Sequence, residues 1–172
     1  LQEKVGAVGA KLYYRNNTVQ HAGCVTGIYG VAGHIYKHQP KNSTGHFGRL
    51  ILEHEVSVVT GACLVIPKDA FNEVNGFDEK ELKVSYNDVD ICLKLRLKGY
   101  KVIFNPFAEL YHLESISRGN DETKEKRELN RYERRKMISR YGELLKYDPY
   151  YNVNLSLENE NVELSFPPRI IK

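Results

Sequence analysis

The twenty residues SYNDVDICLKLRLKGYKVIF, at positions 85–104, predict a helix that leads directly into a strand. Asp88 and Asp90 stand where this helix would begin, and acidic side chains suit the positive end of the helix dipole. Gly99 stands where it would end, as glycine often does after a last helical turn. A helix that returns at once to a strand is the building unit of layered α/β domains. This unit therefore restricts the fold more than any other stretch of the chain.

Further strands are expected on both sides of the unit. Residues 4–14 (KVGAVGAKLYY) and the segment after the following RNNT turn predict a hairpin. The run VSVVTGACLVIP at 56–67 is rich in β-branched residues, which predicts a central strand buried on both faces. After Gly99, two short strands are expected at 100–104 and 108–112, separated by Asn105-Pro106.

Two more helices and two irregular segments complete the expected order. Residues 68–77 predict a short helix stopped at Asn75-Gly76, and residues 27–48 predict a glycine-rich loop. Residues 123–145 predict a long charged helix, and the last 25 residues predict an irregular tail on the surface. One apolar stripe runs along the long helix: Leu129, Tyr132, Met137, Tyr141 and Leu144. The fold class is thus α/β, with few crossover helices for its number of strands, so further strands of the sheet are expected elsewhere.

The charge of the chain says little about its partners. The formal net charge is +3 over 172 residues. Residues 121–140 alone contain eight Lys or Arg against five Asp or Glu. Because acidic residues alternate with the basic ones, we interpret this helix as a solvated face with pairs such as Lys124–Glu128 rather than as a nucleic-acid surface. Weak attachment to an anionic membrane surface stays open.

The cysteines and histidines do not predict a metal site on their own. Cys24, Cys63 and Cys92 lie far apart among apolar neighbours, which is typical of free, buried thiols and of a reducing, cytoplasmic compartment. His34 and His38 have the i, i+4 spacing of zinc ligands on a helix. Their surroundings are too rich in glycine for a helix, so we interpret the segment as a loop at the mouth of a pocket.

The acidic pair at the helix start permits two interpretations. Capping and dipole effects explain Asp88 and Asp90 without any function. A carboxylate fixed at a helix start is also suited to take a proton from a substrate. Spacing alone does not decide between the two interpretations, and the same is true of His112, at the end of the second short strand.

Four stretches in this order resemble one family. They are the hairpin with the loop after it, VVTGACLVIPKDAFNEVNGFDE, YNDVDICLKLRLKGYKVIFNPFAELYHLESISRG and DPYYNVNLSLENENVELSFPPR. Together they resemble the C-terminal half of family 2 glycosyltransferases, of the bacterial rhamnosyltransferase-like type that builds surface polysaccharides. The resemblance covers nearly the whole chain and implies an incomplete GT-A (Rossmann-like) mixed sheet flanked by helices. Residues 1–119 would be the acceptor-side half of that domain and residues 120–172 its C-terminal helix and tail.

The resemblance implies an inverting transfer of a sugar from a nucleotide-diphosphate donor, such as a dTDP- or UDP-sugar, to an acceptor hydroxyl. Asp88 matches the second residue of the family's acidic pair and would be the catalytic base. The family often has glutamate where this chain has Asn87, which would lie beside the acceptor. His112 matches a ligand of the divalent metal, Mn²⁺ or Mg²⁺, that would stabilise the leaving diphosphate.

Two further groups of residues are assigned through the same resemblance. Ser115, Arg118 and Gly119 match a loop that would fold over the donor diphosphate, with Arg118 supplying charge-assisted hydrogen bonds. A floor for the sugar and acceptor is expected from residues in the TGA and GFDE motifs, where small side chains let a substrate approach the backbone: Thr60, Gly61, Ala62, Gly76, Phe77 and Asp78.

The resemblance also implies parts that this chain lacks. The family's nucleobase-binding strands and its D-x-D metal motif would precede Leu1, so a missing N-terminal half of the same protein is an expected partner. The acceptor would be a glycan or a lipid-linked glycan, and the enzyme would be cytoplasmic or peripheral at the inner face of the membrane. Self-association through exposed sheet edges stays open. The alternatives are a non-catalytic glycan-binding or assembly module and, with less support, a metal-dependent hydrolase of nucleotide sugars.

Overall fold

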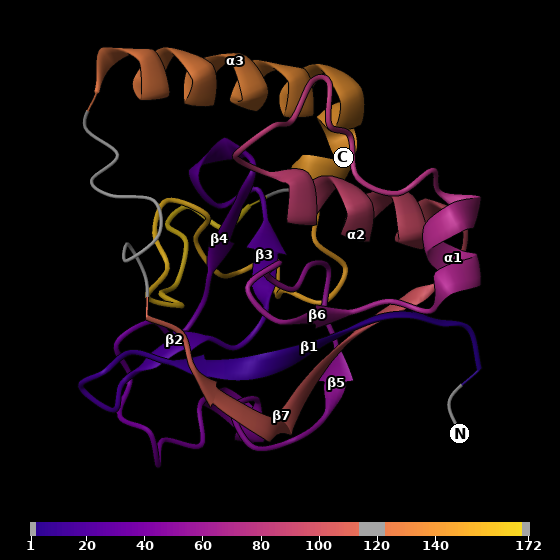
Figure 1. The fold of residues 1–172 in the computed structure, drawn as a ribbon. Coiled ribbons are helices and arrows are strands. Elements are labelled where there is room, and N and C mark those ends of the chain that lie inside the picture. The colour runs from indigo at the N-terminus through magenta and orange to yellow at the C-terminus, as the bar shows by residue number, and fades with distance from the viewer. Residues whose placement is uncertain (1–2, 114–122, 170–172) are drawn as a thin grey trace.

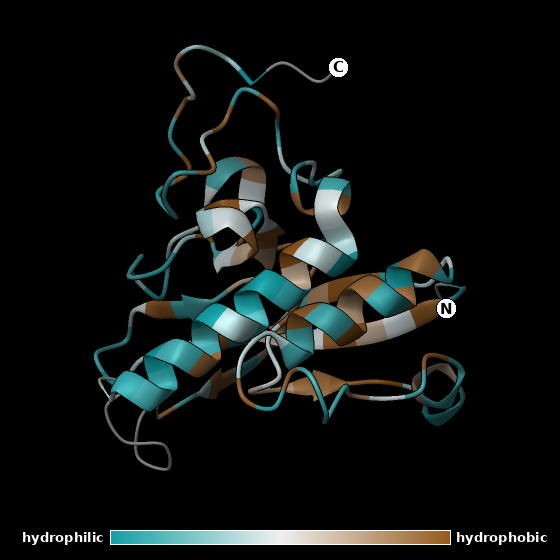
Figure 2. Ribbon diagram, turned by 90° about the horizontal axis from the view of Figure 1, so that it is seen from above, coloured by the Kyte–Doolittle hydropathy of each residue, from teal (hydrophilic) through white to brown (hydrophobic). Residues whose placement is uncertain are grey.

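The computed structural model describes residues 3–113 and 123–169, which form a mixed sheet covered by helices (Figure 1). The sheet lies at the bottom of this view, α2 (Asn87–Leu97) lies above it, and α3 (Lys124–Tyr141) lies above α2. This arrangement confirms the α/β fold class with a long C-terminal helix. Charged side chains cover most of α3, which is largely hydrophilic in Figure 2. Among the described residues, no helix is both long enough and apolar enough to cross a membrane.

The sheet is built around two long parallel strands, β1 (Val5–Tyr13) and β7 (Lys101–Tyr111). The strand order is β2-β1-β7-β5, and β6 also pairs with β1. The short strands β2 (Val19–His21), β5 (His54–Glu55) and β6 (Leu64–Val65) all pair antiparallel. The pairing of β1 with β2 confirms the predicted hairpin.

The prediction of a central strand at 56–67 is wrong. Only β6 is a strand within this range, and the buried valines 56, 58 and 59 lie outside any strand. The reason lies in β1, where Gly9 leaves room for Val59: a Cβ atom on Gly9 would lie 2.4 Å from that of Val59. Val59 therefore lies against the face of β1, while the backbone of Val56 bonds to Val102 of β7 and that of Val58 to Cys24 of β3. A β-branched apolar run is equally suited to a central strand and to an irregular segment that packs on a strand. Composition alone could therefore not distinguish the two structures.

β7 is one strand rather than the two expected around Asn105-Pro106. Its pairing with β1 shifts between Ala10, opposite Asn105, and Lys11, opposite Glu109. Pro106 lies within this irregularity, where its missing N–H costs no regular ladder hydrogen bond. The side chain of Asn105 accepts a hydrogen bond from the backbone N–H of Phe107 instead, at 2.9 Å.

The expected loop at 27–48 is also more ordered than predicted. It contains β4 (Ala32–His34), which pairs with β3 (Cys24–Thr26) in a second, two-stranded sheet. Two short 3-10 helices, η1 (Ile28–Gly30) and η2 (His46–Gly48), complete it. Residues 149–169 are irregular, as predicted for the tail, and the buried carboxylate of Asp148 attaches this segment by accepting a hydrogen bond from the backbone N–H of Thr26 at 2.8 Å.

The helix boundaries follow local signals with one exception. α1 (Lys68–Glu73) ends before Asn75 and Gly76, which both have a positive φ angle, and α2 ends before Gly99, with a φ of 81°. Thr123 caps α3, which continues into η3 (Gly142–Leu145). The exception is the start of α2. The cap residue is Tyr86, which has a left-handed backbone and makes no capping hydrogen bond, so the interpretation of Asp88 as a helix cap is wrong.

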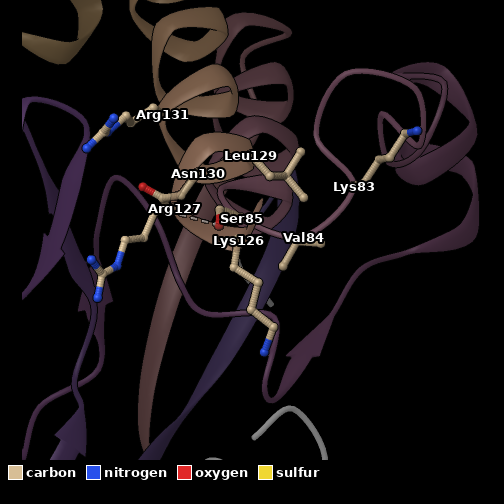
Figure 3. A pocket seen from close by; sticks show the side chains of 8 residues that line it. All are labelled: Lys83, Val84, Ser85, Lys126, Arg127, Leu129, Asn130 and Arg131. Carbon is tan, nitrogen blue, oxygen red and sulfur yellow. Dashed lines mark hydrogen bonds between the residues drawn. The ribbon is translucent and has the colours of Figure 1, made fainter. Parts of the chain in front are cut away.

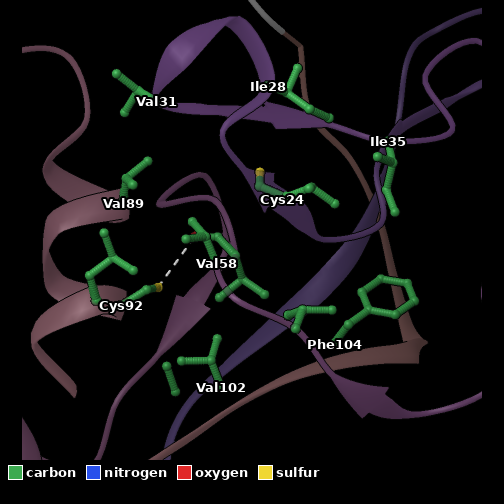
Figure 4. Packing of buried hydrophobic residues seen from close by; sticks show 14 of the residues in the cluster. Cys24, Ile28, Val31, Ile35, Val58, Val89, Cys92, Val102 and Phe104 are labelled. Atoms are coloured by element: carbon green, nitrogen blue, oxygen red, sulfur yellow. Dashed lines mark hydrogen bonds between the residues drawn. The ribbon is translucent and has the colours of Figure 1, made fainter. Parts of the chain in front are cut away.

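The hydrophobic core lies between the sheet, α2 and the β3–β4 sheet (Figure 4). Cys24 and Cys92 are buried in it as free thiols, as predicted, while Cys63 is only half-buried. The thiol of Cys92 contacts the carbonyl of Val59 at 3.7 Å, and burial raises its pKa to about 12. This contact joins α2 to Val59, which packs on β1.

Candidate active site

Asp88 is held between two segments that meet at the start of α2. Its Oδ2 atom accepts a hydrogen bond from the backbone N–H of Gly61 at 2.9 Å, and its Oδ1 atom accepts one from Val89 at 2.9 Å. A carboxylate oxygen has two lone pairs, so each oxygen can still accept another hydrogen. The side chain is half-buried and Gly61 is exposed. Asp88 is therefore fixed in orientation while it remains within reach of a ligand.

The turn that donates to Asp88 is itself held by a buried histidine. The backbone N–H groups of Thr60 and Gly23 both point at Nε2 of His21, at 3.3 Å each, and His21 has no exposed surface. Nε2 must therefore be the unprotonated nitrogen, and Nδ1 carries the hydrogen. The Nδ1 atom of His21 lies 2.9 Å from the Nδ1 atom of His34, so His21 donates this hydrogen bond and His34 accepts it. This role of His21 was not predicted from the sequence.

His21, Cys24 and His34 bring three possible metal ligands within 4.8 Å of one another. The arrangement does not suit an ion, because Nδ1 of His21 uses its hydrogen and Nε2 is occupied by two backbone donors. A thiol and two imidazoles would also favour zinc over Mn²⁺ or Mg²⁺. His38, the partner considered from the spacing of the sequence, instead stacks on Tyr14 with ring centroids 5.0 Å apart. We interpret the cluster as structural.

Acid should destabilise the protein through His21. Burial and the neighbouring His34 hold the pKa of His21 well below its ordinary value, and burial also lowers the pKa of His54. The unfolded chain then binds more protons below about pH 6.5. The free energy of unfolding is expected to be highest above that pH and to fall as the pH is lowered from 7.5 to 5.5, by up to about 1.4 kcal/mol per pH unit for His21.

Chemical denaturation at a series of pH values measures this slope. The variant His21→Gln cannot take up the proton and should flatten the slope, whereas His46→Gln, at an exposed histidine, should retain it. An equal slope in all three proteins would assign the acid sensitivity to other groups.

Asp90 faces the opposite direction from Asp88 and joins α2 to α3. It is fully buried, and its Oδ1 atom accepts hydrogen bonds from Arg140 and from the hydroxyl of Tyr141, both at 2.6 Å. Lys94 Nζ lies 3.1 Å from Oδ2, close enough for an ion pair although its direction does not make a hydrogen bond. Of the two acidic residues at the helix start, Asp90 thus has a structural role.

Arg140 also binds Asp78, which the sequence assigns to the acceptor site. Its Nη2 atom donates to Asp78 Oδ2 at 2.6 Å. The backbone N–H of Glu81 and the Arg140 guanidinium lower the pKa of Asp78. Burial opposes the charge on Arg140, but Asp78 and Asp90 together raise its pKa above the ordinary value. Asp78 therefore lies close to the α2 start, with one of its oxygens used by an internal ion pair.

The remaining predicted acceptor residues fall into two groups. Thr60, Gly61 and Ala62 form a turn beside Asp88, in which Thr60 Oγ1 accepts from the N–H of Ala62 at 3.3 Å. Asn87 begins α2 next to Asp88. Gly76 and Phe77 follow α1 instead: Gly76 is buried and its carbonyl accepts a hydrogen bond from Lys94, while the Phe77 ring packs on Phe71. The structure thus brings the first group to Asp88 and gives the second a packing role.

His112 lies just beyond the end of β7, and its ring orientation is fixed. Its Nδ1 atom lies 2.9 Å from the side-chain oxygen of buried Gln20, while the amide nitrogen of Gln20 donates to the His112 carbonyl at 3.3 Å. His112 Nδ1 is therefore the donor, and in the neutral ring Nε2 carries the lone pair. A metal-binding histidine commonly has this second hydrogen bond, so the geometry of His112 suits one ligand of an ion.

A pocket of about 330 Å³ opens beside His112, and Arg15 and His38 also line it. These side chains would suit an anionic ligand. The predicted donor residues Ser115, Arg118 and Gly119 lie outside the described residues. Among the described residues, sequence reasoning missed His21, Gln20 and Arg140. Each of them bonds to a residue of the site region that is more than thirty-five positions away: Thr60, His112 and Asp90.

Comparison with known proteins gives a consistent result. Residues 9–138 match the family described as glycosyl transferase family group 2. The chain is 48% identical over 163 residues to the uncharacterized protein y4gI of Sinorhizobium fredii and 36% identical over 157 residues to the O-antigen biosynthesis protein RfbC of Myxococcus xanthus. It is 31% identical over 96 residues to an N-acetylglucosaminyl-diphospho-decaprenol L-rhamnosyltransferase of Mycobacterium tuberculosis.

The matched relatives are much longer than the matched segments. The alignments cover 95%, 90% and 55% of this chain, but only 18%, 12% and 31% of the three relatives. The similarity to y4gI and RfbC thus spans nearly all of this sequence and less than a fifth of either relative.

Proposed function

Because the chain belongs to glycosyl transferase family group 2, we propose that it forms the acceptor side of an inverting glycosyltransferase in which Asp88 is the catalytic base. The observation that carries this proposal is the fixed position of Asp88, between the N–H groups of Gly61 and Val89, with Gly61 exposed beside it. A small, exposed turn lets a sugar approach the carboxylate closely.

The proposed reaction is a single displacement. Asp88 takes the proton from an acceptor hydroxyl while the oxygen of that hydroxyl attacks the anomeric carbon of the donor sugar. The bond from that carbon to the nucleotide diphosphate breaks on the opposite face, and the diphosphate leaves with the electron pair. The configuration of the anomeric carbon is inverted as a result.

His112 is the proposed ligand of this chain for Mn²⁺ or Mg²⁺, since the bond from Nδ1 to Gln20 leaves Nε2 as the nitrogen that can coordinate an ion. A bound divalent ion would stabilise the negative charge that develops on the leaving diphosphate. Carboxylate ligands would come from a D-x-D motif of the kind that the family resemblance implies. Gln20 would keep the His112 ring in the tautomer that can bind.

The names of two relatives support the biological setting. RfbC is named for O-antigen biosynthesis and the mycobacterial relative for rhamnosyl transfer to a lipid-diphosphate-linked sugar. We therefore propose a dTDP- or UDP-sugar as the donor, a glycan or lipid-linked glycan as the acceptor, and a role in cell-surface polysaccharide synthesis.

A transfer assay with the intact protein that carries this chain tests the proposal. A panel of dTDP- and UDP-sugars is offered with glycan acceptors, and the anomeric configuration of the product is determined by NMR. We expect transfer with inversion that stops on chelation of the divalent metal. His112→Ala should raise the Mn²⁺ concentration needed for half-maximal rate about tenfold or more, as loss of metal-site contacts commonly does, whereas exposed His46→Ala should not. Retention of configuration, or release of free sugar without an acceptor, would contradict the proposal.

A further inference from the structure

A groove of about 720 Å³ lies between the segment 83–85 and the N-terminal half of α3 (Figure 3). Cationic, apolar and polar side chains all line it: Lys83, Val84, Ser85, Lys126, Arg127, Leu129, Asn130 and Arg131. The groove is separate from the pocket beside His112 and shares no lining residue with it. None of the roles assigned above uses it.

The groove is suited to an anion. Arg127 and Arg131 lie one helical turn apart on α3, and Lys126 extends along the groove in Figure 3. Within residues 3–113 and 123–169, neither arginine has a carboxylate at ion-pair distance, in contrast to Lys136 and Arg140 farther along the same helix. Guanidinium groups bind phosphate oxygens through paired, charge-assisted hydrogen bonds.

The groove is also suited to an apolar group beside that anion. Val84 is 44% exposed and Leu129 is half-buried, and both line the groove next to the cations. A small hydrophilic anion would leave these side chains in water. A phosphate attached to a hydrocarbon chain would cover them and gain from their burial.

The wall of the groove is preformed. The carboxylate of Glu133, which has no exposed surface, accepts hydrogen bonds from three successive backbone N–H groups: those of Lys83 at 2.9 Å, Val84 at 3.1 Å and Ser85 at 2.5 Å. The side-chain amide of Asn130 also donates to Ser85 Oγ at 3.1 Å. The segment 83–85 is therefore attached to α3 before any ligand arrives, which reduces the entropic cost of binding.

The position of the groove relative to Asp88 points to the acceptor. Ser85 lies three residues before Asp88, so their Cα atoms are at most about 11 Å apart. That span is comparable to one hexose unit with its phosphate. The end of β7, which leads to His112 and the proposed donor diphosphate, lies instead at the level of the sheet, while α3 lies above α2 (Figure 1).

We propose that this groove binds the diphosphate, and the first part of the hydrocarbon chain, of a lipid-diphosphate-linked acceptor, whose sugar hydroxyl then faces Asp88. The inference rests on the proposed transferase function and names the class of its acceptor. Arg127 and Arg131 would bind the diphosphate, and Val84 and Leu129 would contact the hydrocarbon chain.

Calorimetric titration of farnesyl diphosphate into the intact protein tests the inference, with UDP titrated separately. The charge-reversed variant R127E/R131E should bind farnesyl diphosphate at least tenfold more weakly than the unchanged protein, and its affinity for UDP should stay within twofold. R135E, which makes the same change at an exposed position of α3 outside the groove, is the matched control and should bind both ligands normally. The milder variant R127Q/R131Q repeats the test if the charge-reversed protein does not fold.

Three results would overturn the inference. They are unchanged binding of farnesyl diphosphate by the folded double variant, an equal loss of UDP binding, and no binding of farnesyl diphosphate by the unchanged, folded protein. A transfer assay with a lipid-free glycan acceptor separates this from failure of the proposed function. Transfer without farnesyl diphosphate binding removes only the inference, and binding without transfer from any donor removes only the proposed function.

Discussion

Replacing Asp88 by asparagine is expected to lower kcat for glycosyl transfer by about 10²–10⁴-fold, the usual contribution of a general base. Asparagine has nearly the same shape and keeps one oxygen that can accept the hydrogen bond from Gly61 or Val89. It cannot take up the proton of the acceptor hydroxyl. The KM values for donor and acceptor should change much less than kcat, because the substitution removes proton transfer rather than a binding contact. Steady-state kinetics with the intact protein measure both.

The matched control is Asp69→Asn, which makes the same change at an exposed position in the first turn of α1. It should retain full activity. A kcat within threefold of the unchanged enzyme in Asp88→Asn would refute the assignment of Asp88 as base, provided that the thermal unfolding of both variants is normal.

The second large effect is expected on stability, at Asp90. Asp90→Ala should lower the free energy of unfolding by about 3 kcal/mol, the lower end of the cost of breaking a buried ion pair. The change removes the acceptor for Arg140 and Tyr141, both of which lie 2.6 Å from Asp90 Oδ1. The cost stays at the lower end because Arg140 keeps its bond to Asp78 and is partly exposed.

Denaturant unfolding followed by circular dichroism measures this difference. Glu143→Ala is the control: its side chain is 86% exposed and, within the part of the chain that the structure describes, pairs only with Lys146. A surface pair of this kind contributes about 0–1 kcal/mol. Equal effects of the two variants would show that the Asp90 network does not hold α3 against α2.

The features that the sequence predicted correctly depend on neighbouring residues. The end of α2 before Gly99 and the break after α1 at Asn75-Gly76 both follow from residues within a few positions. The resemblance to a family, not the spacing, grouped the TGA turn with Asp88. The structure supports that grouping through one hydrogen bond, from Gly61 to Asp88.

The features that the sequence did not predict depend on distant partners. Val59 packs on β1 because Gly9, fifty positions earlier in the sequence, has no side chain. His21 holds the TGA turn only because Thr60, thirty-nine positions later, returns to it and donates its backbone N–H. A buried histidine or glutamate gives no local sign of which backbone N–H groups it will meet, so such roles require the three-dimensional structure.

The attachment of the segment 78–90 to α3 has a consequence for the order of folding. Glu133 holds residues 83–85, and Arg140 holds Asp78 and Asp90, across sequence separations of 48 to 62 positions. Contacts between residues so far apart form slowly, because the intervening chain must first be ordered. During synthesis from the N-terminus, the path of the chain into Asp88 is therefore completed only after the helix that begins at residue 124 has left the ribosome. The attachment of residues 83–85 and of Asp90 to α3 therefore forms later in synthesis than the hydrogen bond from Gly61 to Asp88, which spans only 27 positions.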